Sequence, residues 1–375
     1  MTPVARTILI IGGGFSGMSA AIELRKQGLD VDLVEIDPGW RSYGAGISLG
    51  GATLRAFRRL GILDEFMRLG NAADGIEIYL PNGQQIGALP TPRIAGPDVP
   101  GGGAIMRPVL ARILAEATRA SGASVRLGCT FTEMEQDADG VDVTFTDGQR
   151  RRYDLAIGAD GMYSKTREAL FPDAPKPRYS GQAVWRAVLP RPPEVKTAMM
   201  WMGRVKPGVN PVSATEMYMF ITEHLPRNDW VDPKDFPRRM SDLLEDFPAP
   251  LLQQIRGRLG SNSQIVFRPL EQLLLPQPWH CGRVALIGDA VHATTPHLAS
   301  GACIGIEDAI VLAEELARGE SVEHALQAFE GRRWERCRMV VENSARLGEI
   351  EIAGGDKEEH GRIMRESLMA LAAPI

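Results

Sequence analysis

Short apolar runs without polar alternation mark the first pattern in this chain, at residues 7–11, 155–157 and 284–287. A strand without alternation is usually buried on both faces, as in a parallel sheet. The run at 7–11 leads through glycines into helical apolar spacing at 16–26, and a further apolar run follows at 31–34. Buried strands that alternate with helices predict an α/β fold around a parallel sheet.

A second pattern, alternation of apolar and polar residues, predicts half-buried antiparallel strands at 76–80 and 141–145. Turn residues at Pro81-Asn82-Gly83 and Asp147-Gly148 predict that each strand continues into a hairpin. Further strand-like and helical runs predict an inserted sheet with helices beside it: strands at 183–189, 198–202 and 217–221, and helices at 236–247 and 251–259. A long helix is expected at 322–352, and Gly354-Gly355 separates it from a short charged tail helix.

Composition narrows the class of protein. The chain has 375 residues and a net charge of -5, which argues against nucleic acid as the main partner. No apolar run is long enough to span a bilayer, so we expect no integral membrane association. The four cysteines, at 129, 281, 303 and 337, form no CxxC pair, which favours a reduced, cytoplasmic protein without a zinc site.

The most informative local motif follows the first strand: Gly12-Gly13-Gly14-Phe15-Ser16-Gly17, then a helix, a strand and Glu35. Glycines allow the backbone to approach a pyrophosphate, which rests on the helix N-terminus. Glu35 can accept both ribose hydroxyls and would repel a 2′-phosphate. The motif therefore predicts bound FAD or NAD rather than NADP; a glycine turn without a ligand is the alternative.

Other polar residues stand where ligands bind in α/β sheets, at the carboxyl ends of buried strands. Asp160-Gly161 and Gly288-Asp289 each follow such a strand, although Asp160 can also be read as part of a simple turn. Arg107 precedes Pro108 at a helix start, where a cation is unfavourable unless an anion lies nearby. We expect Arg107 to contact a phosphate or a flavin; a solvated arginine is the alternative.

These motifs together resemble those of the single-component FAD-dependent monooxygenases of the para-hydroxybenzoate hydroxylase type, which include the salicylate, urate and hydroxynicotinate hydroxylases. The pattern GxGxxG spans Gly12–Gly17, DGxxSxxR spans Asp160–Arg167, and GDAxHxxxP spans Gly288–Pro296, followed by Glu307-Asp308-Ala309. The resemblance covers the chain to about residue 345.

The resemblance implies an FAD-binding Rossmann-like sheet of the glutathione-reductase type, an inserted mixed β-sheet that binds the substrate, and C-terminal helices. We expect the FAD-binding domain at 1–75, 101–177 and 269–345, the substrate-binding domain at 76–100 and 178–268, and a helical tail at 346–375. Asp289 is expected to hold the ribityl chain of a non-covalent FAD, and the helix start at Gly301-Ala302 to face its ring. The full set of expected FAD-contacting residues is Gly12, Gly14, Phe15, Ser16, Gly17, Glu35, Ile47, Arg107, Asp160, Asp289, Pro296, Gly301 and Ala302.

One position departs from the family pattern. Ala299 stands where these enzymes usually have a glycine, and alanine tolerates fewer backbone conformations. We expect the departure to affect the geometry of this loop and the mobility of the flavin more than FAD binding.

The implied reaction is hydroxylation of a small planar aromatic or heteroaromatic substrate. NADH or NADPH, a transient reductant, reduces FAD; the reduced flavin and O₂ form a flavin C4a-hydroperoxide, which transfers one oxygen atom. The protein supplies position, electrostatics and exclusion of water. No metal is expected, and the protein is expected to be a monomer or a homodimer.

The inserted strands carry the candidate substrate contacts, in the runs Trp185-Arg186, Met199–Met202 and Tyr218–Phe220. Each of these residues can equally belong to an ordinary sheet core. Tyr218 is the preferred candidate to hold or deprotonate a hydroxyl-bearing substrate. Arg204 and Lys206 are candidates to pair with a substrate anion, with a solvated loop as the alternative, and His292 is expected to be structural.

Two other functions use the same motifs. The first is an FAD-dependent dehydrogenase, reductase or halogenase on the same scaffold, although the WxWxIP element of the flavin halogenases is absent from the sequence. The second is a flavin-binding protein without turnover.

Overall fold

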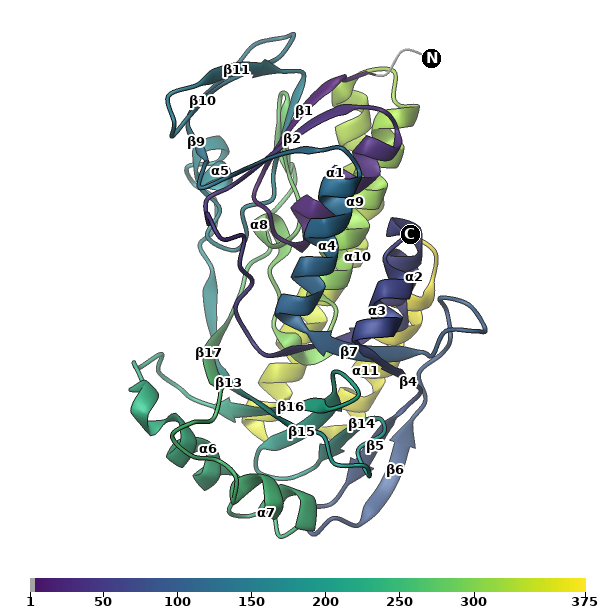
Figure 1. Cartoon of the computed structure of the whole chain (residues 1–375), viewed down its shortest axis with the longest axis vertical. Coiled ribbons are helices and arrows are strands. Elements are labelled where there is room, and N and C mark those ends of the chain that lie inside the picture. Colours follow the sequence, from purple (N-terminus) through teal and green to yellow (C-terminus); the bar gives the residue numbers. More distant parts are fainter. Residues whose placement is uncertain (1–3) are drawn as a thin grey trace.

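A six-stranded sheet forms the upper part of the computed structural model, which describes residues 4–375 (Figure 1). Its strand order is β18-β19-β12-β1-β2-β8, and all neighbours are parallel except β18 and β19. The strands are β1 (Thr7–Ile11), β2 (Asp30–Glu35), β8 (Ser124–Leu127), β12 (Leu155–Gly158), β18 (His280–Cys281) and β19 (Val284–Leu286). The apolar runs that predicted a parallel sheet therefore lie together in it.

This sheet is buried on both faces, which explains why its central strands lack alternation. On one face, Ile8 and Ile10 pack into the main core with α1 (Phe15–Lys26), α4 (Arg107–Ala120) and α9 (Gly301–Arg318). On the other face, Leu9 and Ile11 pack against a small antiparallel sheet. That sheet consists of β9 (Phe131–Gln136), β10 (Val141–Phe145) and β11 (Arg150–Tyr153).

A seven-stranded sheet forms the lower part, with α6 (Phe236–Leu243) and α7 (Pro250–Arg256) beneath it (Figure 1). The strand order is β17-β13-β16-β15-β14-β5-β6, and only β14 and β5 are parallel. The strands are β5 (Ile76–Tyr79), β6 (Gln85–Leu89), β13 (Arg178–Pro190), β14 (Ala198–Trp201), β15 (Lys206–Pro211), β16 (Glu216–His224) and β17 (Ile265–Gln272). Residues 76–89 thus join strands from 178 onward, and β17 runs four residues past the expected boundary at 268; the domain division itself stays a prediction.

Strand β15 was not predicted, because Pro207 and Pro211 argue against a strand inside a sheet. The neighbouring strand β14 pairs with β15 only at Gly208 and Val209. Pro207 and Pro211 lie outside this pairing, so their missing N–H groups cost no hydrogen bond to β14. Pro269 lies in β17, the strand at the edge of the sheet, where proline is tolerated.

A third, small sheet joins the two parts, in the order β3 (Gly46–Gly50), β7 (Gly102–Met106), β4 (Asn71–Ala73). The proline- and glycine-rich interval 87–103 contains the end of β6 and the start of β7. The remaining helices are α2 (Gly51–Leu60), α3 (Leu63–Leu69), α5 (Lys165–Leu170), α8 (Asp289–His292), α10 (Val322–Ala353) and α11 (Lys357–Ala372), with 3₁₀ turns η1 (Pro233–Asp235) and η2 (Pro296–Leu298). Helix α10 runs beside both large sheets (Figure 1).

Across residues 4–375, none of the helices is both long enough and apolar enough to cross a bilayer.

Candidate functional site

The glycine loop after β1 has the geometry of a phosphate cradle. Gly12 has a left-handed φ of 109°, and a Cβ atom at Gly17 would lie 2.0 Å from the Gly12 carbonyl oxygen. A Cβ at Gly14 would meet open space, and helix α1 starts there without a side-chain cap or an acidic residue in its first turn. The N–H groups and positive dipole end of α1 are therefore free for an anion.

The structure places Glu35 beside this loop, as expected from its position at the end of β2. Its carboxylate accepts hydrogen bonds from the Gly13 N–H at 2.7 Å and from the Asp37 N–H at 2.7 Å. These two bonds fix the carboxylate at the rim of the cradle, where a ribose attached to a pyrophosphate would lie.

Asp289 is exposed directly after the buried strand β19 and Gly288. Gly288 has a left-handed φ of 64°, and its N–H donates to Asp308 Oδ2 at 2.9 Å. Asp308 is fully buried and binds His292 Nε2 at 2.6 Å and Arg333 Nε at 2.8 Å. This buried cluster holds the backbone that carries Asp289, which gives His292 the structural role expected of it.

The same cluster brings His292, Asp308 and Cys337 close enough for a shared metal ion. However, Asp308 already has two counter-charges, because Arg333 lies fully buried against it and His292 shares it. The pKa of Asp308 is accordingly far below its usual range, since these cations outweigh the opposing effect of burial. The donor set therefore suits an internal ion pair rather than a metal.

Asp160 has a supporting position. Its Oδ2 accepts hydrogen bonds from the Thr166 N–H at 2.9 Å and the Thr166 hydroxyl at 3.0 Å, and its Oδ1 accepts one from the Ser164 hydroxyl. Ser164 caps helix α5, and the buried Arg167 donates to the Ala290 carbonyl at 2.8 Å. The Asp160 segment thus supports helix α8 beside Asp289, and its carboxylate is used within the segment.

Arg107 lies near Asp289, although 182 residues separate them in the numbering. Its guanidinium stacks 5.0 Å from the centre of the Phe15 ring in the glycine loop. The protein packed around Arg107 lowers the pKa of its guanidinium, and the charge of Asp289 acts in the opposite direction. The side chain remains open to solvent along one side, as a ligand contact requires.

The loop after α8 leads into α9, whose start at Gly301 and Ala302 has no side-chain cap and no acid in its first turn. Pro296 lies in the 3₁₀ turn of this loop. Ala299 has a left-handed φ of 49°, the conformation that the family's usual glycine adopts without strain. The alanine that stands here therefore costs about 1–2 kcal/mol in backbone strain.

Taken together, two open helix starts, a rim carboxylate at Glu35 and the pair Asp289 and Arg107 fit the groups of FAD: a pyrophosphate, a ribose, a polyol chain and a ring that becomes anionic on reduction. Ser16 of α1 packs closely against Gly288 and against Gly305 of α9, because a Cβ atom at either glycine would lie 2.3 Å from the Ser16 hydroxyl oxygen. The starts of α1 and α9 therefore lie side by side. The FAD contacts of individual residues stay predictions, but these parts of the chain lie together.

The seven-stranded sheet presents one face to this region. Tyr218 is buried against Ala45 and Ala104, and a Cβ at Gly46 would lie 2.2 Å from its ring. The Tyr218 hydroxyl makes a short hydrogen bond with the Ser48 hydroxyl, which also accepts from Asn210 Nδ2 at 3.0 Å. Ile47 lies between these contacts on β3.

Arg186, which the sequence placed in a run of candidate substrate contacts without a role of its own, belongs to the same face. In the sheet register, Arg186 lies opposite Phe220, two pairs along from Val188 and Tyr218 and therefore on the same face. Burial lowers the pKa of Arg186, and the positive charges of Arg107 and Arg268 lower it further. The nearby Tyr218 acts in the opposite direction and raises this pKa. Arg186 therefore links the Tyr218 face to the Arg107 side of the site. Arg186 is two residues from Val188, which pairs with Tyr218, so both side chains lie on one face. The sequence alone does not give this pairing between strands.

Two candidates for a substrate anion contact lie elsewhere. Arg204 is 61% exposed and pairs with Asp246 at 3.2 Å, because the turn before β15 packs against Phe247 in the segment between α6 and α7. Lys206 Nζ donates to Glu351 Oε1 of α10 at 2.6 Å, so its charge is used in a contact between the sheet and a helix. The structure therefore favours Arg186 over Arg204 and Lys206 for this role.

The aromatic and methionine runs divide by strand alternation. Trp185, Met199, Trp201 and Met219 point into the core beneath the sheet with α6 and α7. Arg186, Tyr218 and Phe220 belong to the opposite face. The ordinary-core alternative therefore holds for the first set, and substrate contact by the second set stays a prediction.

Comparison with known proteins agrees with this geometry. Residues 5–344 match a family model described as FAD binding domain. A putative FAD-dependent monooxygenase of Bacillus subtilis is 31% identical over 350 residues, covering 92% of this chain and 94% of that protein. The 2-heptyl-3-hydroxy-4(1H)-quinolone synthase of Pseudomonas aeruginosa is 33% identical over 352 residues, covering 92% of this chain and 90% of that protein.

A crystal structure of Klebsiella pneumoniae HpxO with FAD and uric acid has a TM-score of 0.84 to this chain at 25% identity, covering 98% of this chain and 97% of that one. The predicted fold class is thereby confirmed, as is the resemblance drawn from the motifs. The cofactor is FAD, and the enzyme class is flavoprotein monooxygenase. This chain belongs to the FAD binding domain family and, within it, to the FAD-dependent monooxygenases.

Proposed function

We propose that this enzyme hydroxylates a small planar aromatic or heteroaromatic compound that carries an ionisable hydroxyl or ring N–H group, with NADH or NADPH as a transient reductant and O₂ as the oxygen source. The observation that carries the proposal is that Tyr218, with Arg186 on the same face of its sheet, packs against Ala45 and Gly46. The Ala45 carbonyl in turn accepts a hydrogen bond from the Arg107 N–H at 3.0 Å, on the flavin side of the fold. Uric acid, which the Klebsiella structure contains, is a planar heteroaromatic compound of this kind.

FAD, once reduced, supplies the activation of oxygen, and the residues of this chain supply placement and charge. Arg186 is a half-buried cation on the site face of the sheet, so it favours the anionic form of a substrate that is electron-rich when deprotonated. An electron-rich ring is the form that accepts an electrophilic oxygen atom.

Tyr218 is proposed to hold the substrate rather than to deprotonate it. Burial raises the pKa of Tyr218, and the opposing effects of the Ser48 hydrogen bond and the Arg186 charge are smaller. The phenol therefore stays protonated at neutral pH and can donate a hydrogen bond to a substrate oxygen. Ser48 and Asn210 fix the position of the hydroxyl.

The state of the cysteines bears on the cellular compartment of the enzyme. All four cysteines are free, which supports a proposal that the enzyme acts in the reducing cytoplasm.

The test combines spectroscopy with an oxygen electrode. The purified protein is expected to carry oxidised flavin absorbance, and phenols and N-heterocycles are screened for stimulated NADH or NADPH oxidation coupled to O₂ uptake and product. A hit should lose affinity in Arg186→Met, with KM rising about tenfold or more for loss of a buried charge contact, whereas Arg204→Met should change KM little. NAD(P)H oxidation that ignores oxygen would instead indicate a reductase, and absence of flavin would contradict the proposal altogether.

A further inference from the structure

Trp40 has a backbone conformation that bulky residues rarely adopt. Its φ of 46° lies in the left-handed region, which only Ala299 shares among the non-glycine residues of 4–375. Such positions are strained, and they cluster at functional sites where the surrounding structure holds them. Ala299 lies in the loop that leads to α9, and Trp40 lies beside the glycine loop that leads to α1. Both strained residues therefore stand next to the open helix starts of the flavin site.

A charged turn holds Trp40 in this conformation. The Asp37 carboxylate accepts hydrogen bonds from the Gly39 N–H, the Arg41 N–H and the Arg41 guanidinium, each at 2.9 Å. The Trp40 N–H donates to the Asp37 carbonyl at 3.1 Å, and the Asp37 N–H in turn donates to Glu35. These bonds, the one from the Arg41 side chain above all, hold the pKa of Asp37 far below its usual range. The turn is therefore tied to the end of β2 beside the glycine loop.

The indole of Trp40 makes a specific polar contact with that loop. Its Nε1–H donates to the Gly13 carbonyl at 2.8 Å, and the Arg119 guanidinium of α4 lies 5.1 Å from the centre of the Trp40 ring. A Cβ atom at residue 13 would lie 2.4 Å from Trp40 Nε1. The GxGxxG pattern leaves residue 13 open, so the close approach of Trp40 explains why a glycine stands there.

Gly13 is therefore held by two hydrogen bonds. Its N–H donates to Glu35 Oε2 at 2.7 Å, while its carbonyl accepts from Trp40. In a trans peptide the C=O and the following N–H point to opposite sides of the chain. The Trp40 bond thus turns the Gly14 N–H away from the indole. Gly14 is the N-cap of α1, and its N–H is one of the amides that a helix start leaves without an intrahelical partner.

We propose that Trp40 is a positioning residue for FAD, which turns the Gly13–Gly14 peptide so that the Gly14 N–H donates to the diphosphate of the cofactor. An open helix start with free N–H groups is suited to this anion. Glu35 supports the same peptide, because it binds both Gly13 and Asp37. The inference concerns the cofactor and goes beyond the proposed function, since it does not depend on the substrate that is hydroxylated.

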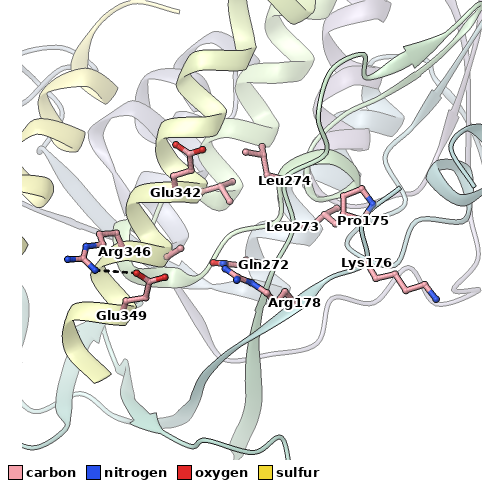
Figure 2. A pocket seen from close by; sticks show the side chains of 11 residues that line it. Pro175, Lys176, Arg178, Gln272, Leu273, Leu274, Glu342, Arg346 and Glu349 are labelled. Atoms are coloured by element: carbon pink, nitrogen blue, oxygen red, sulfur yellow. Dashed lines mark hydrogen bonds and ion pairs between the residues drawn. The ribbon is translucent and has the colours of Figure 1, made fainter. Parts of the chain in front are cut away.

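Another place on the molecule offers cations to a diphosphate and provides a control. A cavity of about 460 Å³ between α10 and strands β13 and β17 is lined by Lys176 and Arg178, among others (Figure 2). Arg346 also lines it, but Arg346 is paired with Glu349 at 3.3 Å. If FAD bound through this cavity, Arg178→Met would weaken it and a Trp40 variant would not.

FAD titration of the full chain, freed of bound cofactor and followed by flavin fluorescence, tests the proposal. Trp40→Phe keeps an aromatic ring and removes the N–H, so the dissociation constant should rise about fivefold, the effect of one hydrogen bond. The phosphorus NMR signals of the bound diphosphate should shift, whereas the flavin absorbance spectrum should not. Trp40→Gly removes the indole without backbone strain and should weaken FAD binding at least as much. Trp230→Phe, at a tryptophan that is 79% exposed, and Arg178→Met should change neither quantity.

Three results would overturn the proposal. The first is an unchanged dissociation constant in the Trp40 variants. The second is a loss of affinity with unmoved phosphorus signals, because Trp40 would then act on the site as a whole rather than on the diphosphate. The third is an equal loss in Arg178→Met. Trp40→Gly decides if urea denaturation shows that Trp40→Phe does not fold. Neither substrate nor NAD(P)H is present, so failure of the proposed hydroxylation and failure of this inference are distinguishable.

Discussion

At the scale of single residues, the site depends on small positions that let larger groups approach. Gly46 makes room for the ring of Tyr218, and Gly348 for His297 and Gln182. The sequence showed Gly46 within a glycine-rich segment but not what packs against it. The motif residues Gly12, Gly17, Glu35 and Asp289 could be given roles because their chemistry is local. Arg186 was named only within a run of candidate contacts, because its role depends on which side of a strand faces the flavin.

Tyr218→Phe tests the holding role of the phenol. The variant should raise KM about tenfold, as expected for one buried hydrogen bond, and leave FAD binding unchanged. Steady-state kinetics with an identified substrate measure this, and Tyr79→Phe on the same sheet is the control, because Tyr79 bonds Glu77 away from the site. A kcat that collapses above pH 7 with Tyr218 intact and recovers in the variant would contradict a phenol that stays protonated.

Ala299→Gly tests the strain in the loop before α9. Glycine adopts a φ of 49° freely, so the variant should gain up to about 1 kcal/mol in free energy of unfolding, since relief of strain exceeds the entropy lost by glycine. Urea denaturation measures it. Ala302→Gly, in the first turn of α9, should lose stability by up to about 1 kcal/mol. A destabilised Ala299→Gly protein would show that alanine is unstrained there.

At the scale of elements, the buried ion cluster beneath Gly288 connects three helices to the strand end that carries Asp289. Arg333 from α10 and Asp308 from α9 meet His292 from α8, and Glu307 adds a contact to Arg333 at 3.1 Å. Helix α10 was predicted at 322–352 and lies at Val322–Ala353, and the start of α9 at Gly301 was expected from the resemblance. Strand β15 was not predicted, because its prolines are tolerated only since β14 is short and pairs with β15 at two residues. That length of pairing is not visible in the sequence.

Asp308→Asn should weaken this junction by about 3–5 kcal/mol, because buried Arg333 loses its partner charge. Chemical denaturation measures the loss, and Asp246→Asn, at an exposed ion pair, should cost less than about 1 kcal/mol. If Asp308→Asn lost no more free energy of unfolding than the control, the buried cluster would not be what holds the backbone at Asp289.

The pH dependence of stability follows from the same group. The folded pKa of Asp308 is depressed, so its contribution is fully present above the unfolded value near 4 and is lost as pH falls toward the folded pKa. Thermal unfolding between about pH 6 and 3 should therefore show a smaller acid destabilisation in Asp308→Asn than in the unaltered protein. Parallel curves for the two proteins would contradict the depressed pKa.

At the scale of the whole molecule, FAD is expected to bridge segments that are distant in sequence: the glycine loop, Arg107, Asp289 and the start of α9. A ligand that binds only the folded state stabilises it by about 2.7 kcal/mol at a hundred times its dissociation constant. The melting temperature of the full chain should therefore rise with added FAD. Glu35→Gln and Asp289→Asn should each reduce the rise at fixed FAD, whereas Asp64→Asn on α3, away from the site, should not. An equal rise in melting temperature in all variants would show that Glu35 and Asp289 do not contribute to FAD binding.

The amino-acid sequence by itself determined the α/β class, the parallel sheet, the glycine loop with Glu35 and the family, because unbroken apolar runs and motif spacing reflect local backbone geometry and burial. Tertiary structure alone decided which face of the inserted sheet meets the flavin side. Alternation separates Arg186, Tyr218 and Phe220 from Trp185, Met199 and Met219, but only the packing of α6 and α7 assigns the second set to the core. It also decided the positions of Lys206 and His297, whose partner Glu351 lies far along the chain, since ion pairs between distant segments leave no periodic signal in a single sequence.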